Sequence, residues 1–186
     1  MRKILVVKGS PRKLSFSGAL ADKAVKGIKD AGGTVEEIVL ENYNIKPCRA
    51  CNGCEKSESI CTVKDDMAFL YNKITEADGF ILASPVYWFN MTAQMKTFID
   101  RWYALFMKDE NFLKDKTAGI IMTYADDDAF SSGAVNALRS FQDIFNYCQG
   151  HIIDIVHTCE ENLKEKKHSI FEKSYELGQM LAKDHI

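Results

Sequence analysis

The feature that most constrains the fold is a strict alternation of short β-rich runs with longer amphipathic stretches. Five apolar runs, rich in β-branched residues, alternate with five segments whose apolar residues recur every three or four positions. This alternation is typical of a parallel sheet with helices on both faces. The β-rich runs cover residues 3–8, 34–40, 79–84, 118–124 and 151–157, and the helical stretches cover residues 20–28, 67–74, 95–106, 138–145 and 170–181.

The distribution of charge predicts the order of the strands. The cores of the first, third and fourth runs carry no charged residue, whereas Glu36 and Glu37 lie in the second run and Asp154 lies in the fifth. Charges are better tolerated on edge strands, which are partly hydrated. Edges at runs two and five give five parallel strands in the order 2-1-3-4-5. That order belongs to the flavodoxin-like doubly wound α/β fold, whose ligand crevice lies at the carboxyl ends of strands one and three.

Length and charge limit the domain organisation and the partners. A chain of 186 residues is long enough for one well-buried core, so we expect a single domain over residues 1–186, with a cysteine-rich loop inserted at about 42–65. The net charge of −2 gives no electrostatic case for nucleic acid or an anionic membrane as partner. The first apolar run stops at Lys8, too early for a signal peptide, so a cytoplasmic location is expected.

A polar loop, GSPRKLSFSGALA, follows the first strand. Gly9 permits a tight turn, Ser10, Ser15 and Ser17 offer hydroxyl groups, and Arg12 offers positive charge where a helix is expected to begin near Ser17. Such a loop can cradle a phosphate group, although a capped turn with solvated basic residues also fits the residue types. The GxxxxGK, C-x5-R and GxGxxG patterns are absent, which argues against a P-loop, a tyrosine phosphatase and a tightly held dinucleotide.

An aromatic loop, SPVYWFNM, follows the third strand. The side chains of Pro85, Val86, Tyr87 and Trp88 offer a platform for a flat conjugated ring, and the alternative is that the aromatic side chains pack under a loop or against another subunit.

The loop after the fourth strand, TYADDDAFSSG, places Tyr124 near the same ring. Its three consecutive carboxylates, Asp126–Asp128, are expected to form a solvated turn, with Asp128 or Ser131 as the N-cap of the next helix.

Four cysteines form a C-x2-C-x2-C-x6-C pattern. Structural zinc sites usually consist of two separated C-x2-C pairs, whereas a closely spaced run is more typical of iron-sulfur ligation. Zinc, or thiols without any metal, remain alternatives, because the spacing alone does not decide among them. The candidate ligands are Cys48, Cys51, Cys54 and Cys61.

The motifs GSPRK, SPVYW and MKTFIDR, together with the cysteine pattern and DDM, occur in an order that resembles the NAD(P)H-dependent FMN reductase group of flavodoxin-like proteins, and within it the iron-sulfur flavoproteins. The resemblance extends from residue 3 to about Tyr124. It implies that the FMN phosphate binds Ser10, Arg12 and Ser17, that the isoalloxazine ring binds residues 85–88, and that the four cysteines hold a 4Fe-4S cluster. Phe16 departs from the group, which usually has a small polar residue there, and is expected to cover the flavin or an interface instead.

The function implied by this resemblance is that of an FMN-dependent oxidoreductase. Electrons would come from NAD(P)H as a transient co-substrate, or from a ferredoxin-like donor, and pass to a small-molecule acceptor in a homodimer or homotetramer. The alternatives are an electron carrier without an organic substrate and a metal-stabilised binding module that has lost its flavin. Because the cysteine loop leaves the carboxyl end of the second strand, we expect it on the flavin side of the sheet, with an electron path that can also cross a subunit contact.

Overall fold

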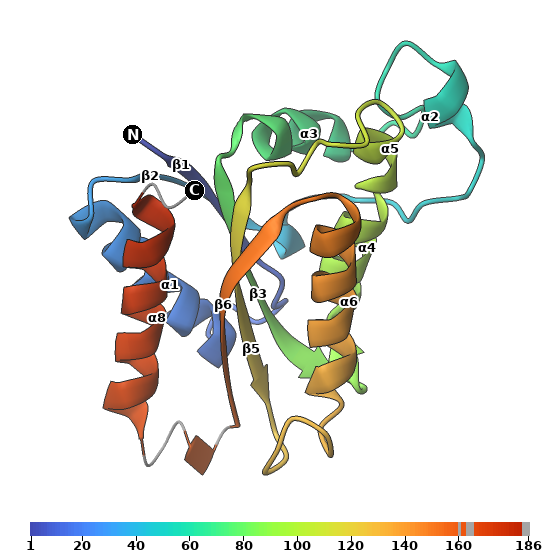
Figure 1. The fold of residues 1–186 in the computed structure, drawn as a ribbon. Helices are drawn as coiled ribbons and strands as arrows, with labels where there is room; N and C mark the ends of the chain where they lie inside the picture. The colour runs from blue at the N-terminus through green and yellow to red at the C-terminus, as the bar shows by residue number, and fades with distance from the viewer. Residues whose placement is uncertain (160, 163–165, 184–186) are drawn as a thin grey trace.

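The computed structural model, which describes residues 1–159, 161–162 and 166–183, has a central sheet between two layers of helices (Figure 1). Five strands run parallel in the order β2-β1-β3-β5-β6, and a sixth, β4, pairs antiparallel with the end of β3. The strands are β1 (Lys3–Lys8), β2 (Thr34–Val39), β3 (Gly79–Tyr87), β4 (Asn90–Met91), β5 (Thr117–Tyr124) and β6 (His151–Cys159).

The predicted fold class is correct, but the predicted number of strands is wrong. The five parallel strands have the expected relative order, with β2 and β6 at the edges, yet the sheet contains six strands and reads 2-1-3-5-6 rather than 2-1-3-4-5. The extra strand β4 follows a two-residue hairpin turn formed by Trp88 and Phe89, whose φ angles are 47° and 65°. Turns with two positive φ angles favour Asn-Gly, so a Trp-Phe pair carries no turn signal.

The helices form two layers, one on each face of the sheet (Figure 1). In β1 the side chains of Ile4 and Val6 pack with the layer that contains α1 and α8, and those of Leu5 and Val7 pack with the opposite layer, as the two-residue period of a strand requires. Within the described ranges, no helix is both long enough and apolar enough to cross a lipid bilayer. The helices are α1 (Phe16–Asp30), α2 (Gly53–Lys56), α3 (Met67–Glu76), α4 (Ala93–Asp100), α5 (Tyr103–Phe106), α6 (Ala134–Tyr147) and α8 (Lys167–Ala182), with a 3₁₀ turn η1 (Leu40–Asn42).

The single helix expected over residues 95–106 is divided into α4 and α5 by Arg101 and Trp102. The N–H of Trp102 donates to the carbonyl of Ile99 at 2.9 Å, one residue closer than in an α-helix. This tighter turn interrupts the helix and lets Trp102 pack against Phe80 with ring centroids 5.5 Å apart.

Helices α1 and α8 are in direct backbone contact. A Cβ atom on Gly178 of α8 would overlap the carbonyl oxygen of Ala24 in α1, and one on Gly27 of α1 would overlap the carbonyl oxygen of Tyr175 in α8. The approach of the two backbones therefore depends on a glycine in each helix.

Substitution of Gly178 by alanine is expected to lower the free energy of unfolding by about 1–3 kcal/mol, because the methyl group meets backbone atoms that can move only if the helices separate. Urea denaturation of the variant and the wild type measures this difference. The control is Lys173→Ala on the exposed face of α8, for which a change within about 0.5 kcal/mol is expected. Equal stability of Gly178→Ala and the wild type would contradict the close contact.

Candidate functional site

A cleft of about 1220 Å³ lies at the carboxyl ends of the strands, where the loops after β1, β3 and β5 meet. This is the position expected for a ligand in a doubly wound sheet. All of the predicted cofactor residues except Ser17 line it. These residues are Ser10, Arg12, Ser15, Pro85, Val86, Tyr87, Trp88 and Tyr124.

The loop after β1 offers hydrogen-bonding groups at the N-terminus of α1. Ser15 is the N-cap, and its hydroxyl accepts a hydrogen bond from the N–H of Gly18 at 3.1 Å. The Ser10 hydroxyl accepts from the N–H of Arg12 at 3.2 Å. Ser17 lies behind the cleft lining, 1% exposed, and its hydroxyl makes no hydrogen bond within the described chain. A buried hydroxyl without a partner beside a helix N-terminus is suited to an anionic ligand.

Thr92, which no sequence motif had indicated, joins the loops around the cleft. Its buried hydroxyl donates to the carbonyl of Gly9 at 2.7 Å and accepts from the N–H of Met95 at 3.2 Å, so it also caps α4. The N–H of Thr92 donates to the hydroxyl of Ser84 at 3.1 Å. Sequence alone shows only a threonine before a helix, which indicates an N-cap and not a link to the loop after β1.

The turn after β3 places Trp88 in the lining of the cleft, with the Phe89 ring packed beside it. Trp88 and Phe89, which are 92% and 52% exposed, occupy left-handed backbone conformations that bulky residues rarely adopt. The side-chain amide of Asn136 in α6 holds this turn by donating to the carbonyl of Phe89 at 3.1 Å. The guanidinium of Arg12 lies 5.9 Å from the ring centroid of Tyr87, which connects the loop after β1 to the aromatic platform.

Tyr124, which lines the cleft, belongs to a hydrogen-bonded pair that the sequence did not indicate. The Tyr124 hydroxyl and Nδ1 of His157 lie 2.9 Å apart, and either can donate, depending on the imidazole tautomer. Burial raises the pKa of Tyr124, and the neighbouring Cys159 and Asp128 act in the same direction. No local pattern in the sequence signals this pair, because the contact depends on the register between β5 and β6.

The acidic turn after β5 lies outside the cleft lining. The Asp128 carboxylate accepts hydrogen bonds from the N–H groups of Phe130 at 2.6 Å and Ser131 at 3.0 Å, which lower its pKa. The N-cap of α6 is Gly133, so the expectation that Asp128 or Ser131 caps this helix is wrong. The Asp128 carboxylate instead stabilises the separate turn formed by residues 128–131.

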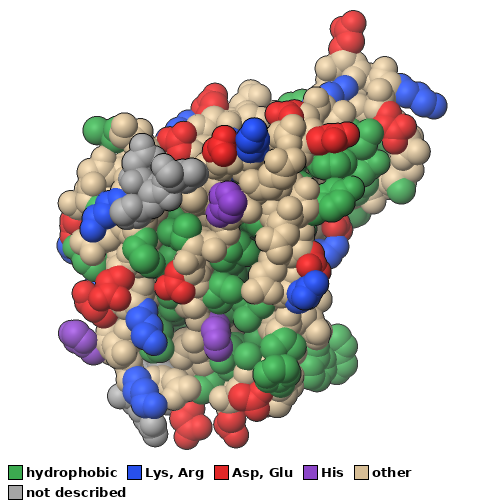
Figure 2. Space-filling model, viewed as in Figure 1, with side chains coloured by type: hydrophobic (Ala, Val, Ile, Leu, Met, Phe, Trp, Pro, Cys, Tyr) green, Lys and Arg blue, Asp and Glu red, His purple; other side chains and the backbone are tan. Residues whose placement is uncertain are grey.

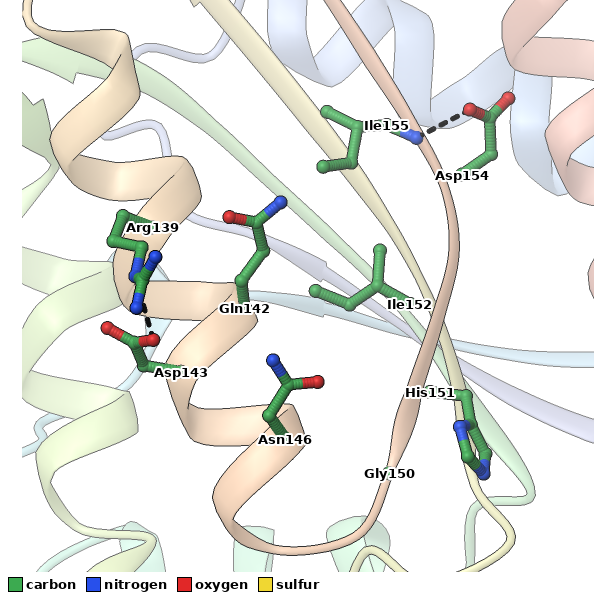
Figure 3. Close-up of a pocket in the computed structure, with 9 residues that line it drawn as sticks. All are labelled: Arg139, Gln142, Asp143, Asn146, Gly150, His151, Ile152, Asp154 and Ile155. Carbon is green, nitrogen blue, oxygen red and sulfur yellow. Dashed lines mark hydrogen bonds and ion pairs between the residues drawn. The ribbon is translucent and has the colours of Figure 1, made fainter.

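A second, polar groove of about 650 Å³ lies between α6 and β6 (Figure 3). Ile152 and Ile155 point from β6 toward α6, while Arg139 and Asp143 on α6 form an ion pair at 2.8 Å. None of the predicted cofactor or metal-binding residues lines this groove.

The four cysteines of the predicted metal site line one small cavity of about 30 Å³. Cys54 is buried and Cys61 is half-buried, whereas Cys48 and Cys51 are exposed, and all four thiols are free. Over residues 1–159, 161–162 and 166–183, no group of three or more Cys, His, Asp or Glu side chains is arranged to hold a metal ion. The thiols thus share a cavity without forming a completed coordination site in this structure.

Two of these thiols have opposite electrostatic environments. Hydrogen bonding from the N–H of Gly53 and from the Thr62 hydroxyl lowers the pKa of Cys51. Burial raises the pKa of Cys54. Because the thiolate is the form that binds metal, Cys51 is the better prepared of the two as a ligand.

The cysteine loop is not on the cleft side of the sheet, where it was expected. After η1 the chain runs back to the end of the sheet at which the strands begin, and the segment with α2 projects there (Figure 1). The cavity is lined by residues of the C-terminal end of α4 and of α5, beside the start of β3. Cleft and cysteines are therefore separated by the length of the sheet, and β1 alone rises about 20 Å over its six residues.

A buried ion pair fixes the base of the cysteine loop. Arg101 is 1% exposed, and its Nη1 donates to Oδ2 of Asp65 at 2.5 Å and to the carbonyl of Lys46 at 2.8 Å. The same Asp65 oxygen accepts from the N–H of Lys46 at 2.9 Å, so both ends of the loop meet at one carboxylate. Burial alone would raise the pKa of Asp65, but the hydrogen bonds from Arg101 and the backbone outweigh it and hold the pKa below its usual value.

Comparison with known proteins agrees with this geometry. Residues 2–157 match the family model described as NADPH-dependent FMN reductase. The chain belongs to this family.

Several known proteins resemble the chain to different extents. An "Iron-sulfur flavoprotein" from Archaeoglobus fulgidus is 39% identical over 123 residues, which cover 66% of this chain and 54% of that protein. A "Putative NAD(P)H-dependent FMN-containing oxidoreductase YwqN" from Bacillus subtilis is 30% identical, with 78% of each chain covered. The solved "NAD(P)H:quinone oxidoreductase from Methanothermobacter marburgensis" has a TM-score of 0.77 at 18% identity and covers 100% of this chain and 99% of its own, which shows a shared fold.

In this member of the FMN reductase family, Asp65→Asn is expected to lower the free energy of unfolding by about 3–5 kcal/mol at pH 7, because it leaves the buried Arg101 charge without its partner. Urea denaturation measures the loss. The folded-state pKa of Asp65 is lowered, so the contribution of the pair is complete above the ordinary Asp pKa of about 3.9 and is lost as pH falls below it. The difference in free energy of unfolding between the variant and the wild type should therefore become smaller at acid pH.

The matched control is Asp66→Asn, one residue further along, where the exposed carboxylate accepts a hydrogen bond from the N–H of Asn44. A smaller loss of free energy of unfolding is expected for Asp66→Asn. An equal loss in both variants would show that the ion pair with Arg101 contributes no more stability than the exposed contact of Asp66.

Proposed function

We propose that the protein is an FMN-dependent oxidoreductase that takes electrons from a reduced nicotinamide and passes them to a small-molecule acceptor. The observation that carries this proposal is the cleft at the carboxyl ends of β1, β3 and β5, which brings a polar loop at a helix N-terminus together with an aromatic platform. Membership of the NADPH-dependent FMN reductase family supports it.

The residues around the cleft fit FMN. The phosphate would bind at the N-terminus of α1, where the hydroxyls of Ser10 and Ser15 and the unpartnered hydroxyl of Ser17 are gathered, and Arg12 would supply positive charge. The isoalloxazine ring would lie against residues 85–88 and Tyr124, and Phe16, which is 46% exposed and lines the cleft, would cover it. When bound, FMN supplies the electron-transfer chemistry, and the protein supplies anchorage and orientation.

The donor and the acceptor are proposed from the names of similar proteins. The Bacillus subtilis relative is described as NAD(P)H-dependent and FMN-containing, which supports NAD(P)H as a transient co-substrate, with a ferredoxin-like donor as the alternative. The Methanothermobacter neighbour is described as a quinone oxidoreductase, which supports a small organic acceptor. The free state of all six cysteines supports a reducing compartment such as the cytoplasm.

We further propose that Cys48, Cys51, Cys54 and Cys61 hold a 4Fe-4S cluster. Their spacing, the cavity that they share and the description of the Archaeoglobus relative as an iron-sulfur flavoprotein support this assignment. Because the thiols do not converge in this structure, the cluster would have to draw the exposed Cys48 and Cys51 inward on binding.

A homodimer or homotetramer is proposed from the placement of the two sites. Within one chain the cysteines and the cleft lie at opposite ends of the sheet, so electron transfer between them would run more directly to the cleft of a neighbouring copy. Exposed apolar side chains at both ends support such a contact. Trp88 and Phe130, in the loops that follow β3 and β5, are 92% and 81% exposed, and Tyr147, at the C-terminal end of α6, is 74% exposed. Figure 2 also shows exposed hydrophobic side chains below the projecting loop.

Substitution of Arg12 by alanine is expected to weaken FMN binding by about 1.5–3 kcal/mol, or roughly 10- to 150-fold in the dissociation constant, because a charge-assisted phosphate contact is lost. Titration of the apoprotein followed by flavin fluorescence measures this change. Lys23→Ala removes the same charge from α1 outside the cleft lining and should leave the affinity unchanged. An unchanged affinity in Arg12→Ala, or stoichiometric FAD in the purified protein, would overturn the assignment of the loop.

Serine at any of the four loop cysteines is expected to lower the iron content after anaerobic reconstitution from about four atoms per chain, while FMN stays bound, because the two sites share no side chain. Iron and flavin assays on the same samples measure both quantities, and Cys148→Ser, outside the loop, is the control. Uptake of no iron by the wild type, or of a single zinc ion, would contradict the cluster.

A further inference from the structure

Two side chains from neighbouring strands connect the cleft to bulk solvent. Tyr124, at the end of β5, lines the cleft and is 8% exposed. His157, on edge strand β6, is exposed, and its Nδ1 lies 2.9 Å from the Tyr124 hydroxyl. The two rings are stacked, with centroids 5.9 Å apart and planes inclined by 30°. A single hydrogen bond therefore joins a group in the cleft to a titratable group at the surface.

An irregularity in the sheet makes this contact possible. Ala118 pairs with Ile152, but Gly119 pairs with Asp154, so Ile153 is an extra residue in β6. Beyond this bulge, His157 pairs with Met122 and lies on the same face of the sheet as Met122 and Tyr124. Without the extra residue, every later side chain of β6 would point to the opposite face, and His157 would be directed away from Tyr124.

The proposed reaction needs a proton at this place when the acceptor is a carbonyl or quinone. Reduction of a quinone to a hydroquinone consumes two electrons and two protons. If one hydrogen nucleus arrives with the electron pair from the reduced cofactor, the acceptor oxygen is left as an anion that must gain one more proton. Lys8, Lys13 and Tyr87 also line the cleft, and Lys8 is held in ion pairs with Asp22 at 2.5 Å and Glu37 at 2.7 Å. Tyr124 differs from these side chains in its hydrogen bond to a histidine that is itself exposed.

We propose that Tyr124 and His157 form a proton relay that serves the reduction of a quinone-type acceptor in the cleft. The proposal rests on the proposed function and specifies its acceptor class. Tyr124 is the catalytic residue, and His157 is the positioning residue that acts through it. The oxygen anion of the reduced acceptor takes the phenolic proton, the phenolate takes a proton from the imidazolium of His157, and His157 regains a proton from water. No electrons pass through the pair, and one proton moves from solvent to product in each turnover.

The surroundings of Tyr124 keep it in the protonated state that the relay needs. Burial raises its pKa, and Cys159 on β6 and Asp128 in the loop after β5 raise it further. From α6 the packing neighbour is the apolar Ala134. Tyr124 is thus a neutral proton donor between turnovers.

The first test compares two acceptors on FMN-loaded protein that has been reduced with dithionite, so that its outcome does not depend on the nicotinamide donor. In stopped-flow mixing, oxidation by 1,4-benzoquinone should slow by about 10- to 100-fold in Tyr124→Phe and in His157→Gln. Oxidation by ferricyanide, which takes electrons without a proton, should change by less than about twofold. The control is His151→Gln, exposed on the same strand in the polar groove, and it should match the wild type with both acceptors.

The pH dependence separates proton delivery from a purely structural effect. In the wild type, the benzoquinone rate should fall as the pH is raised, because less imidazolium is then present to return a proton to Tyr124. The glutamine side chain in His157→Gln can still hydrogen-bond to Tyr124 but cannot titrate, so this fall should disappear. Equal losses with both acceptors, or an unchanged pH profile in His157→Gln, would overturn the relay.

The hydrogen bond between Tyr124 and His157 can also be tested without a bound cofactor, by nitrogen-15 NMR of the histidine side chains in the apoprotein. Tyr124→Phe should shift the Nδ1 resonance of His157 and leave that of His151 in place, and an unshifted His157 resonance would show that the hydrogen bond is absent in solution. Failure of the wild type to be reduced by NADH or NADPH would count against the proposed function. The relay itself is decided by the dithionite and NMR experiments.

Discussion

One buried ion pair determines how the cysteine segment is attached to the rest of the molecule. Arg101, in the turn between α4 and α5, meets Lys46 before the segment and Asp65 after it. A buried charged pair is most stable when its remaining hydrogen-bonding capacity is satisfied. Asp65 also accepts the N–H groups of Lys46 and Met67, whereas the buried Nε of Arg101 has no hydrogen-bond partner among the described residues. The segment between the two contacts is therefore a loop whose two ends are held together at its base and whose tip is exposed.

Helix α4 links this base to the cleft at the other end of the sheet. Thr92, which caps the start of α4, bonds the carbonyl of Gly9 in the loop after β1, and Arg101, which follows its end, bonds Asp65. The eight residues of α4 rise about 12 Å between these two contacts. Because the helix is held at both ends by buried hydrogen bonds, the two candidate sites have a fixed relative position although they share no side chain.

The parts of the structure that sequence could predict are those determined by local pattern. Alternating periodicity identified the parallel strands, charges such as Glu36 and Asp154 identified the edges, and loop composition located most of the cleft. The errors arose where tertiary contacts override local signals. The Trp88–Phe89 turn is held by Asn136 of a distant helix, the cysteine segment is carried to the far end of the sheet by a buried arginine, and a bulge beside Gly119 sets the face of the last strand.

The backbone contact between α1 and α8 has a consequence for biosynthesis. These two helices form one layer, yet they come from opposite ends of the described chain, and the apolar side of α1, including Leu20 and Ile28, is buried in the cluster that α8 completes. Until α8 has been synthesised, that surface can pack against the sheet but lacks the part of its native cover that α8 supplies. Productive folding of this layer must therefore wait for the synthesis of α8, and the nascent chain presents a binding surface for chaperones until then.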